Sequence, residues 1–385
     1  MNVVEATTIS ITQHAFVLPI AEALRAHGND VALVCSDEKR DEGSSFVDQL
    51  RSRGFEVFEI PMSRRISPLR DLLATFRLYR FLKSRRIDLL HVQTAKAGMI
   101  GRIAARLAAV PVVVYTAHAF AFHDYLPWWR KHLYATLERL ASHLCDVIVV
   151  DSEAVKRRGV EFKLAPSKIR VIPMGIDTDR FSPMRRNELR DSTRRALDIP
   201  REAPVLGLAA RFVPDKGLET FVDAAARIAL RRQDVFFLMV GDGPLRRDIE
   251  RRISDYGLAR AFRLPGMQSE VEAYYAAMDV FMLPTLREGF GVAFCEAMSM
   301  QIPVVATRIA PLTDVVTDAL TGFLADAGDA EGFAAAAERL IVSPALRATM
   351  GQAGRLRVVE HFSVQRMVRE HELLFDSLTS GRDHG

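Results

Sequence analysis

The stretch "DVFMLPTLREGFGVAFCEAMSMQIPVVAT" (residues 279–307) places a glycine-containing loop and a helical segment between two short apolar runs. The runs, 279–285 and 302–307, have few alternating polar positions, which is typical of strands buried on both faces. A helix that begins near Val292 connects the loop to the second run. A strand, a helix and a second strand in this order predict a parallel sheet covered by helices.

The same pattern recurs along the chain and indicates the fold class. Further strand candidates are the apolar runs 30–36, 88–94, 111–118, 146–152, 204–210 and 235–241. The segments between runs, such as 218–232 and 334–341, have helical spacing and length. These repeated strand–helix–strand units predict one or two doubly wound α/β domains.

The chain is expected to divide into two halves. Its 385 residues are enough for two ordinary domains, each with its own core. A break is visible near 170–183, and a charged stretch with few apolar residues comes after it, before the next strand candidate. We therefore expect an N-terminal domain over 1–178 and a C-terminal domain over 179–362. Residues 363–385 have the pattern of an amphipathic helix, which we expect to pack back on the N-terminal domain.

The composition argues against several classes of protein. Hydrophobic residues make up 49% of the chain and charged residues 26%, which indicates a globular protein without bulk disorder. The three cysteines, Cys35, Cys145 and Cys295, lack metal-ligand spacing and fit a reduced, cytosolic compartment. Cys295 is interpreted as a small apolar helix residue rather than a nucleophile. We find neither a signal peptide nor a run of about 18 apolar residues, so a cytoplasmic location is expected.

Three loops of the second half follow the carboxyl ends of strand candidates, where open α/β sheets bind their ligands. The first loop, 209–219, carries Arg211 and Lys216 ahead of a helix. A planar guanidinium and a mobile ammonium on one loop suit a diphosphate, although the loop alone is equally typical of a solvated turn. The second loop, 240–250, opens a helix with Gly241 and lacks the third glycine of a dinucleotide fingerprint.

The third loop holds Glu288, Gly289 and Gly291 and leads into the helix near Val292. Glycines permit backbone angles that turn N–H groups toward a ligand, and the positive end of the helix favours an anion. About one turn inside that helix, Glu296 is placed to accept hydrogen bonds from a ribose diol. Three loops of this character on one sheet edge predict a ligand that contains both phosphate and hydroxyl groups.

The ordered loops resemble those of the retaining glycosyltransferase family 4. The residues that carry the resemblance are "GFGVAFCEAM" (289–298) with Glu288 ahead of it, "AARFVPDKG" (209–217), "VGDGPL" (240–245) and "VIPMGIDTDRFSP" (171–183). The resemblance extends over nearly the whole chain. It implies the GT-B fold, in which two Rossmann-like doubly wound α/β domains face each other across a cleft.

The resemblance also implies a role for each motif residue. The residues expected to act in catalysis are His118, Arg211, Lys216 and Glu288, of which Arg211 and Lys216 would neutralise the diphosphate. The residues expected to bind the donor are Gly241, Met267, Gly289, Phe290, Gly291, Val292 and Glu296. Among these, Met267 would contact the base through its main chain, and Glu296 would bind the ribose.

His118 ends the apolar run 111–118, and aromatic residues and His123 follow it. Family members place a histidine at this strand end against the donor sugar, which favours that role for His118. For His123, a functional role and a packing role both stay open. A metal site formed by His118, His123 and Asp124 lacks diagnostic spacing, and the "DTD" at 177–179 is expected to cap a turn. We therefore expect sugar transfer without a metal ion or other cofactor.

The segment 63–86 combines apolar residues at helical spacing with many basic residues. The apolar residues are Leu69, Leu72, Leu73, Phe76 and Tyr79, and the basic ones are Arg64, Arg65, Arg70, Arg77, Arg80, Lys83, Arg85 and Arg86. An ordinary helix with its apolar side in the core has this pattern, and so does a helix that rests on anionic lipid. The basic and aromatic stretch around Trp128 and Trp129 favours contact with a membrane surface. A nucleic-acid reader motif is missing, so nucleic acid is not an expected partner.

Together these features predict a metal-independent, retaining hexosyltransferase. Its donor would be a nucleotide sugar, with UDP as the expected nucleotide. Its acceptor would be polyprenyl-diphosphate-linked or a saccharide in cell-surface polysaccharide synthesis, which suits a peripheral position on the cytoplasmic face of the inner membrane. Two alternatives stay open: a sugar-nucleotide 2-epimerase of the same architecture, and a non-catalytic, membrane-associated binding protein with the GT-B fold.

Overall fold

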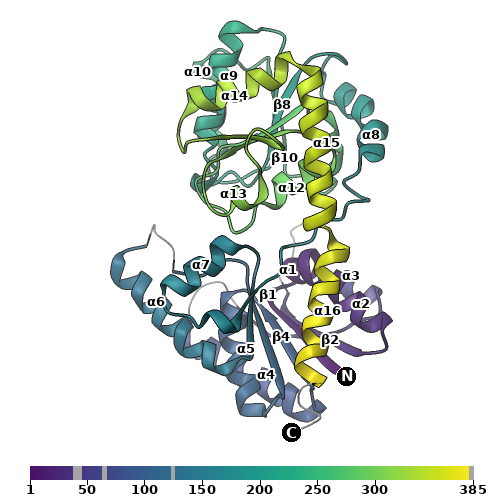
Figure 1. Ribbon diagram of the computed structural model, residues 1–385, viewed down its shortest axis with the longest axis vertical. Helices are drawn as coiled ribbons and strands as arrows, with labels where there is room; N and C mark the ends of the chain where they lie inside the picture. The colour runs from purple at the N-terminus through teal and green to yellow at the C-terminus, as the bar shows by residue number, and fades with distance from the viewer. Residues whose placement is uncertain (38–45, 63–66, 123–125, 381–385) are drawn as a thin grey trace. The chain divides into compact units, whose positions relative to one another are not determined.

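The computed structural model describes residues 1–37, 46–62, 67–122 and 126–380. The chain folds into two compact units, one formed by Met1–Gly175 with Gln365–Gly385 and the other by Ile176–Val364. Each unit has one parallel sheet against which its helices pack (Figure 1). The predicted doubly wound α/β architecture is confirmed. Within the described ranges, no helix combines the length and the apolar character needed to cross a bilayer.

The sheet of the first unit has seven strands in the order β3-β2-β1-β4-β5-β6-β7. Their bounds are β1 (Asn2–Ile9), β2 (Asp30–Ser36), β3 (Glu56–Glu59), β4 (Leu89–Gln93), β5 (Val112–Ala117), β6 (Val147–Val150) and β7 (Ile169–Val171). The strand order changes direction at β1, which pairs with β2 on one side and β4 on the other. In open α/β sheets, ligands bind outside the carboxyl ends of the strands at such a switch point.

The helices of the first unit are α1 (Ser10–Thr12), a π-helix (Gln13–Val17), α2 (Leu18–Ala26), α3 (Phe46–Ser52), α4 (Pro68–Arg85), α5 (Ala95–Ala108), α6 (Trp128–Ala141), α7 (Glu153–Glu161), α16 (Val364–Ser380) and two short 3-10 turns (Ser142–Leu144 and Pro166–Lys168). Helices α4, α5 and α6 bury apolar side chains in one core with the sheet. Helix α16 packs on the same unit, because the rings of His371 and Phe375 each lie 5.4 Å from the His91 ring in β4.

Strand β1 is central in the sheet, although its sequence lacks the apolar pattern. Glu5 and Thr7 within it are fully buried. The Nδ1 atom of His91 lies 2.8 Å from Glu5 Oε2, and its Nε2 atom lies 2.7 Å from Thr116 Oγ1. Burial raises the pKa of Glu5 and lowers that of His91 to about 3, which favours an uncharged pair. Polar partners on neighbouring strands therefore replace the apolar residues that a sequence search looks for.

The sheet of the second unit has six strands in the order β10-β9-β8-β11-β12-β13. Their bounds are β8 (Val205–Ala209), β9 (Phe236–Val240), β10 (Phe262–Gly266), β11 (Val280–Leu283), β12 (Val304–Thr307) and β13 (Gly322–Ala325). Apart from β1, the strands that the sequence pattern did not predict are β3, β7, β10 and β13, which are the edges of the two sheets. Edge strands have a ladder partner on one side only and are less completely buried, so their sequences are less apolar.

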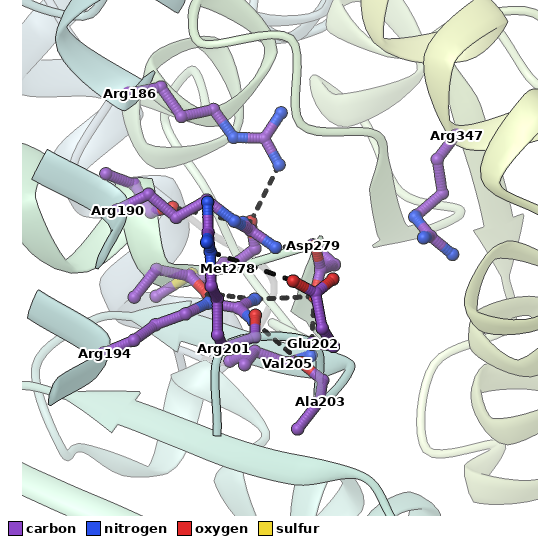
Figure 2. Close-up of polar contacts among 12 residues, drawn as sticks. Arg186, Arg190, Arg194, Arg201, Glu202, Ala203, Val205, Met278, Asp279 and Arg347 are labelled. Atoms are coloured by element: carbon purple, nitrogen blue, oxygen red, sulfur yellow. Dashed lines mark hydrogen bonds and ion pairs between the residues drawn. The ribbon is translucent and has the colours of Figure 1, made fainter. Parts of the chain in front are cut away.

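The helices of the second unit are a 3-10 turn (Pro214–Lys216), α8 (Pro183–Ala196), α9 (Leu218–Arg231), α10 (Arg246–Asp255), α11 (Val271–Ala277), α12 (Val292–Ser299), α13 (Leu312–Val315), α14 (Ala330–Val342) and α15 (Pro344–His361). The charged stretch after residue 183 forms α8. Arg194 of this helix is only 1% exposed and donates to Asp279 Oδ2 over 2.8 Å (Figure 2). The stretch lacks apolar residues because the buried Arg194 and the half-buried Arg186 and Arg190 take their place.

Candidate functional site

Two of the predicted catalytic residues meet at the carboxyl edge of the second sheet. Lys216 lies in the loop after β8, and Glu288 lies in the loop after β11. The Lys216 Nζ atom donates to Glu288 Oε1 over 2.6 Å, and the two side chains are only 16% and 14% exposed. The pair therefore joins two of the three loops through one half-buried ion pair.

The backbones of the same two loops are also fixed against each other. The amide of Leu286 donates to the Asp215 carbonyl over 2.8 Å, and the Thr285 hydroxyl donates to the same carbonyl over 2.9 Å. Gly217 has φ +63°, and a Cβ atom there would lie 1.9 Å from the Pro284 carbonyl oxygen. A larger residue at Gly217 would push the loops apart, so glycine here sets the distance between Lys216 and its partner.

The loop after β9 approaches the Arg211 loop just as closely. Gly241 has φ +132°, and a Cβ atom there would lie 1.9 Å from the Ala210 carbonyl oxygen. The Phe212 amide donates to the Asp242 carbonyl over 2.8 Å. From the sequence, Gly241 was expected to let the backbone approach a ligand. The structure shows a second reason for glycine at this position, because the two loops pack closely against each other here.

The Arg211 side chain differs from that of Lys216, because it forms no ion pair with another described residue. The residue is exposed, and within the part of the chain that the structure describes no side chain pairs with its guanidinium. Its position is nevertheless fixed, because the neighbouring Phe212 is fully buried and the Arg211 carbonyl accepts from the Val213 amide over 3.0 Å. A fixed cation without a partner at this edge is suited to bind an anionic ligand.

The third loop ends at the start of α12. Gly291 precedes the helix with φ +106°, where a Cβ atom would lie 2.6 Å from a Leu312 methyl group. The first two amides of α12, those of Val292 and Ala293, have no acceptor within the helix and carry its positive end, whereas the Phe294 amide donates to the Gly291 carbonyl over 3.0 Å. Phe290 is buried and packs edge-on against Phe362, with ring centroids 5.3 Å apart. Phe290 therefore offers a ligand its main chain rather than its ring.

Glu296, expected to bind the ribose, has an unusual environment in α12. The Tyr275 hydroxyl donates to Glu296 Oε2 over 2.9 Å. Burial raises the pKa of Glu296 to about 7, although the Tyr275 hydrogen bond and the Arg180 charge oppose the shift. Arg180 is itself paired with Glu272 over 2.7 Å. Near neutral pH, Glu296 thus titrates between a neutral acid and a carboxylate. Met267, the predicted base contact, is 65% exposed.

In the first unit, His118 directly follows β5. Its Nδ1 atom lies 3.0 Å from Asp151 Oδ2, and its Nε2 atom lies 3.0 Å from Gln93 Oε1. The ring of Phe16 lies 5.6 Å from the His118 ring. Burial alone would lower the pKa of His118, but the charge and hydrogen bond of Asp151 outweigh burial and raise it. The imidazole is therefore fixed in orientation and biased toward its charged form.

Comparison with known proteins identifies the family. Two family models match the chain, Glycosyltransferase Family 4 over residues 14–180 and Glycosyl transferases group 1 over residues 190–357. The UDP-Gal:alpha-D-GlcNAc-diphosphoundecaprenol alpha-1,3-galactosyltransferase of Escherichia coli is 31% identical over 344 residues, which cover 88% of this chain and 87% of the relative. The chain belongs to the family 4 glycosyltransferases.

This family 4 glycosyltransferase has further relatives over its full length. The capsular polysaccharide biosynthesis glycosyltransferase CapM of Staphylococcus aureus is 28% identical and covers 92% of both chains. The structure of Anabaena HepE in complex with UDP and glucose has a TM-score of 0.81 at 21% identity, covering 98% of this chain and 100% of that one. A glycosyltransferase from Rickettsia africae has a TM-score of 0.82 at 20% identity and covers 98% of each chain. These structures confirm the predicted GT-B fold.

Two polar residues of the glycosyltransferase that contact His118 were not predicted. Gln93 is the last residue of β4, and Asp151 directly follows β6. Both end an apolar run, as His118 does, and this shared position is the signal that would have found them. Of the other candidates in this region, His123 and Asp124 lie outside the described residues.

The remaining predictions concern metal ions and cysteines. In the described ranges, no three His, Cys, Asp or Glu residues are grouped as metal ligands. The "DTD" segment forms the predicted turn, because Asp177 Oδ1 accepts from the Asp179 and Arg180 amides over 3.1 and 2.9 Å. Cys295 is fully buried in α12, and burial raises its thiol pKa, which fits the predicted packing role.

Proposed function

We propose that this family 4 glycosyltransferase is a retaining hexosyltransferase that uses a UDP-sugar and a lipid-linked or saccharide acceptor in cell-surface polysaccharide synthesis. The observation that carries the proposal is the carboxyl edge of the second sheet. There the unpaired Arg211 guanidinium and the Lys216–Glu288 pair accompany the free amides at the start of α12. Cations and amides around one edge suit a diphosphate whose charge increases as the sugar leaves.

Arg211 and Lys216 neutralise the departing diphosphate in this proposal. Arg211 binds the phosphates without breaking an internal ion pair. Lys216 shares its ammonium between Glu288 and the ligand, so that Glu288 both orients Lys216 and faces the sugar hydroxyls. Because the protein supplies these positive charges, we propose that transfer needs neither a metal ion nor another cofactor.

The remaining donor contacts follow from the other site residues. Glu296 accepts hydrogen bonds from the ribose diol in its carboxylate form, and the Met267 main chain contacts the base. The main chains of Gly241, Gly289, Phe290, Gly291 and Val292 line the phosphate and sugar. His118, held by Asp151 and Gln93, is the residue of the first unit that we propose to act on the donor sugar.

The chemical step that we propose retains the anomeric configuration. The bond from the anomeric carbon to the β-phosphate oxygen breaks, and the acceptor oxygen bonds to the same face of that carbon. The acceptor proton passes to the departing phosphate oxygen, so nucleoside diphosphate and glycoside are the products. Charge stabilisation by Arg211 and Lys216 favours the dissociated, oxocarbenium-like transition state.

The acceptor is proposed from the relatives. By its name, the Escherichia coli relative acts on alpha-D-GlcNAc-diphosphoundecaprenol, and CapM by its name acts in capsular polysaccharide biosynthesis. We infer a polyprenyl-diphosphate-linked acceptor here, and with it a peripheral position on the cytoplasmic face of the inner membrane. No feature of the described residues favours nucleic acid as a partner.

One incubation tests this proposal against its alternatives. The purified enzyme is mixed with UDP-, GDP- and ADP-sugars and a bacterial lipid extract, with and without EDTA. We expect transfer from a UDP-sugar to lipid that EDTA does not inhibit, with the donor configuration retained in the NMR spectrum of the product. An isomerised nucleotide sugar without transfer indicates a 2-epimerase, and ligand binding without turnover indicates a binding protein. Transfer with inversion, or only with a metal ion, contradicts the proposed mechanism.

A further inference from the structure

Helix α4 exposes the apolar residues that an ordinary core helix would bury. Its buried side consists of Ala74, Thr75, Leu78, Phe81 and Leu82. Its opposite side carries Leu69, Leu72, Leu73 and Phe76, which are 83%, 68%, 50% and 53% exposed. The helix is therefore apolar on two sides, and only one of them is covered by the first unit.

Helix α6 has the same property. Ala135, Glu138 and Ala141 face the unit. The exposed residues Trp129, Leu133, Leu137 and Leu140 recur every three or four positions and form a stripe along the helix, with Trp128 at its start. No other described element of the unit covers the stripe, because each of these side chains is at least 43% exposed.

The two exposed sides belong to one face of the first unit. Helices α4, α5 and α6 contribute to the same buried core, with α5 packed against both neighbours (Figure 1). Leu107 of α5 is also exposed, at 63%. We call the exposed sides of α4 and α6 the α4–α6 face. Soluble proteins rarely expose so many large apolar side chains together unless the patch binds a partner.

The charges on this face point to an anionic partner. Arg70, Arg77, Arg80 and Lys83 are exposed on α4, and no acidic side chain of the described residues pairs with them. Arg85 at the end of the helix, by contrast, is paired with Glu56. An open groove of about 760 Å³ lies beside the unpaired cations, lined by Phe58, Phe76, Arg77, Tyr79, Arg80 and Lys83 among others. Aromatic and basic side chains in one groove suit the interface between lipid headgroups and acyl chains.

We propose that the α4–α6 face docks on the surface of an anionic phospholipid bilayer. Its apolar side chains enter the acyl boundary, and its unpaired cations bind the headgroup phosphates. The membrane as partner rests on the proposed lipid-linked acceptor. Because a helix between parallel strands runs back from their carboxyl edge, α4 and α6 both begin at the edge where His118 follows β5. Docking thus brings that edge to the surface at which a lipid-linked acceptor presents its diphosphate.

The experiment measures binding to vesicles by co-sedimentation. The whole protein is mixed with phosphatidylcholine vesicles and with vesicles that also contain phosphatidylglycerol. We expect binding to the anionic vesicles only, weakening as salt increases. The variant Arg77→Glu/Arg80→Glu should bind at least about 25-fold more weakly, from about fivefold for each basic charge. The variant Trp128→Ala/Trp129→Ala should lose at least about tenfold from the lost apolar burial.

Matched controls lie in the second unit. Leu230→Gln replaces a side chain that is 88% exposed, and Arg247→Glu reverses an exposed charge. Both controls should bind vesicles like the parent protein. Equal loss in the controls, or unchanged binding of the α4 and α6 variants, overturns the proposal. So does a dimer in analytical ultracentrifugation that only the face variants dissociate, since a second copy of the chain would then cover the face.

A second measurement separates this proposal from the proposed function. The rise in melting temperature on adding UDP measures ligand binding to the proposed donor site of the second unit. This rise should be the same in all variants of the α4–α6 face. Vesicle binding without any stabilisation by UDP would count against the proposed donor while leaving the docking face intact. Stabilisation by UDP without vesicle binding would reject the docking face and leave the donor site standing.

Discussion

Helix α8 and the loop after β8 both contain arginines, but among the described residues only arginines of α8 are bound by other groups of the protein. In α8, Arg194 donates to the carbonyls of Ala277 and Arg201 as well as to Asp279. Arg186 donates to the Met278 carbonyl over 3.0 Å (Figure 2). Arg211 in the β8 loop, in contrast, has no side-chain partner among the described residues.

The α8 arginines and Arg211 differ because the former lie at the carboxyl end of a helix, whereas Arg211 lies where helices begin. The α8 arginines face carbonyls at the carboxyl end of α11, where the helix dipole is negative. Burial lowers the pKa of Arg186 to about 10, with the Arg190 charge adding to the effect. For Asp279, burial opposes ionisation, but the Arg190 and Arg194 charges outweigh it and lower its pKa. Arg211 lies instead at the carboxyl edge of the strands, where helices begin and anions are favoured. The same residue type thus stabilises the fold in one place and remains available to a ligand in the other.

The largest expected effect comes from removing the acid of the buried set. Asp279→Ala leaves Arg190 and Arg194 without their counter-charge, so we expect a loss of about 3–5 kcal/mol in the free energy of unfolding of the second unit. Urea denaturation measures it. As a control, Asp248→Ala removes an exposed pair with Arg251 and should cost less than about 1 kcal/mol. Equal losses for the two variants would remove the distinction between buried and surface cations.

The next effect concerns activity rather than stability. Arg211→Ala should lower kcat by about 10²–10³-fold, because the residue that we propose to donate to the departing diphosphate is lost. The free energy of unfolding should change by less than about 0.5 kcal/mol, since the side chain has no internal partner. Initial rates of donor consumption and urea titrations check both halves. If the Arg211 variant were strongly destabilised, Arg211 would stabilise the fold as the α8 arginines do, which would contradict the proposed role.

Lys216 should show an intermediate behaviour, because it is paired and yet lies at the ligand edge. Lys216→Ala should lower the rate by about 10²-fold. Glu288→Gln keeps the shape of the acid and removes its charge, and the double variant completes a thermodynamic cycle. We expect a coupling energy of about 0.5–3 kcal/mol in the rate, since the two groups touch. Additive effects would mean that the pair observed here is not used during the reaction.

The smallest expected effect is the pH dependence of donor binding. The pKa of Glu296 is raised to about 7, and the carboxylate is the form that accepts hydrogen bonds from a ribose diol. Affinity for UDP should therefore rise by up to about tenfold from pH 6 to pH 8 and level off above the pKa. The same raised pKa means that this group favours the folded state less as pH increases toward 7. Isothermal titration at several pH values tests the first statement, and Glu296→Gln should bind independently of pH over this range.

Local patterns in the sequence were sufficient for the fold class and for the motif loops. Eight apolar runs correspond to strands, and the loops after β8, β9 and β11 are those expected to hold the ligand. The family could be recognised from the order and spacing of these loops, and the comparisons confirm it. These features can be predicted because a buried strand and the loop after it have a recognisable residue pattern within a few positions of the sequence.

Other features could not be predicted, because they depend on contacts between residues that are far apart in the sequence. Strand β1 was missed because Glu5 finds His91 on another strand, 86 residues away along the chain. The exposed side of α4 was compatible with a core helix, since helical spacing does not say which side is covered. Gln93 and Asp151 lie at strand ends as His118 does, but the sequence does not show that these strand ends adjoin, because the residues are 25 and 33 positions from His118.

The sequence by itself determined a parallel α/β protein of the family 4 glycosyltransferases and predicted that the loops of the second half bind phosphate. Only the tertiary structure decided which cationic side chains pair with other groups of the protein and which have no side-chain partner among the described residues. Arg194 meets Asp279 across 85 residues and Lys216 meets Glu288 across 72, whereas Arg211 meets no side chain among the described residues. The physical reason is that electrostatic energy depends on distance in space, and a sequence gives only distance along the chain.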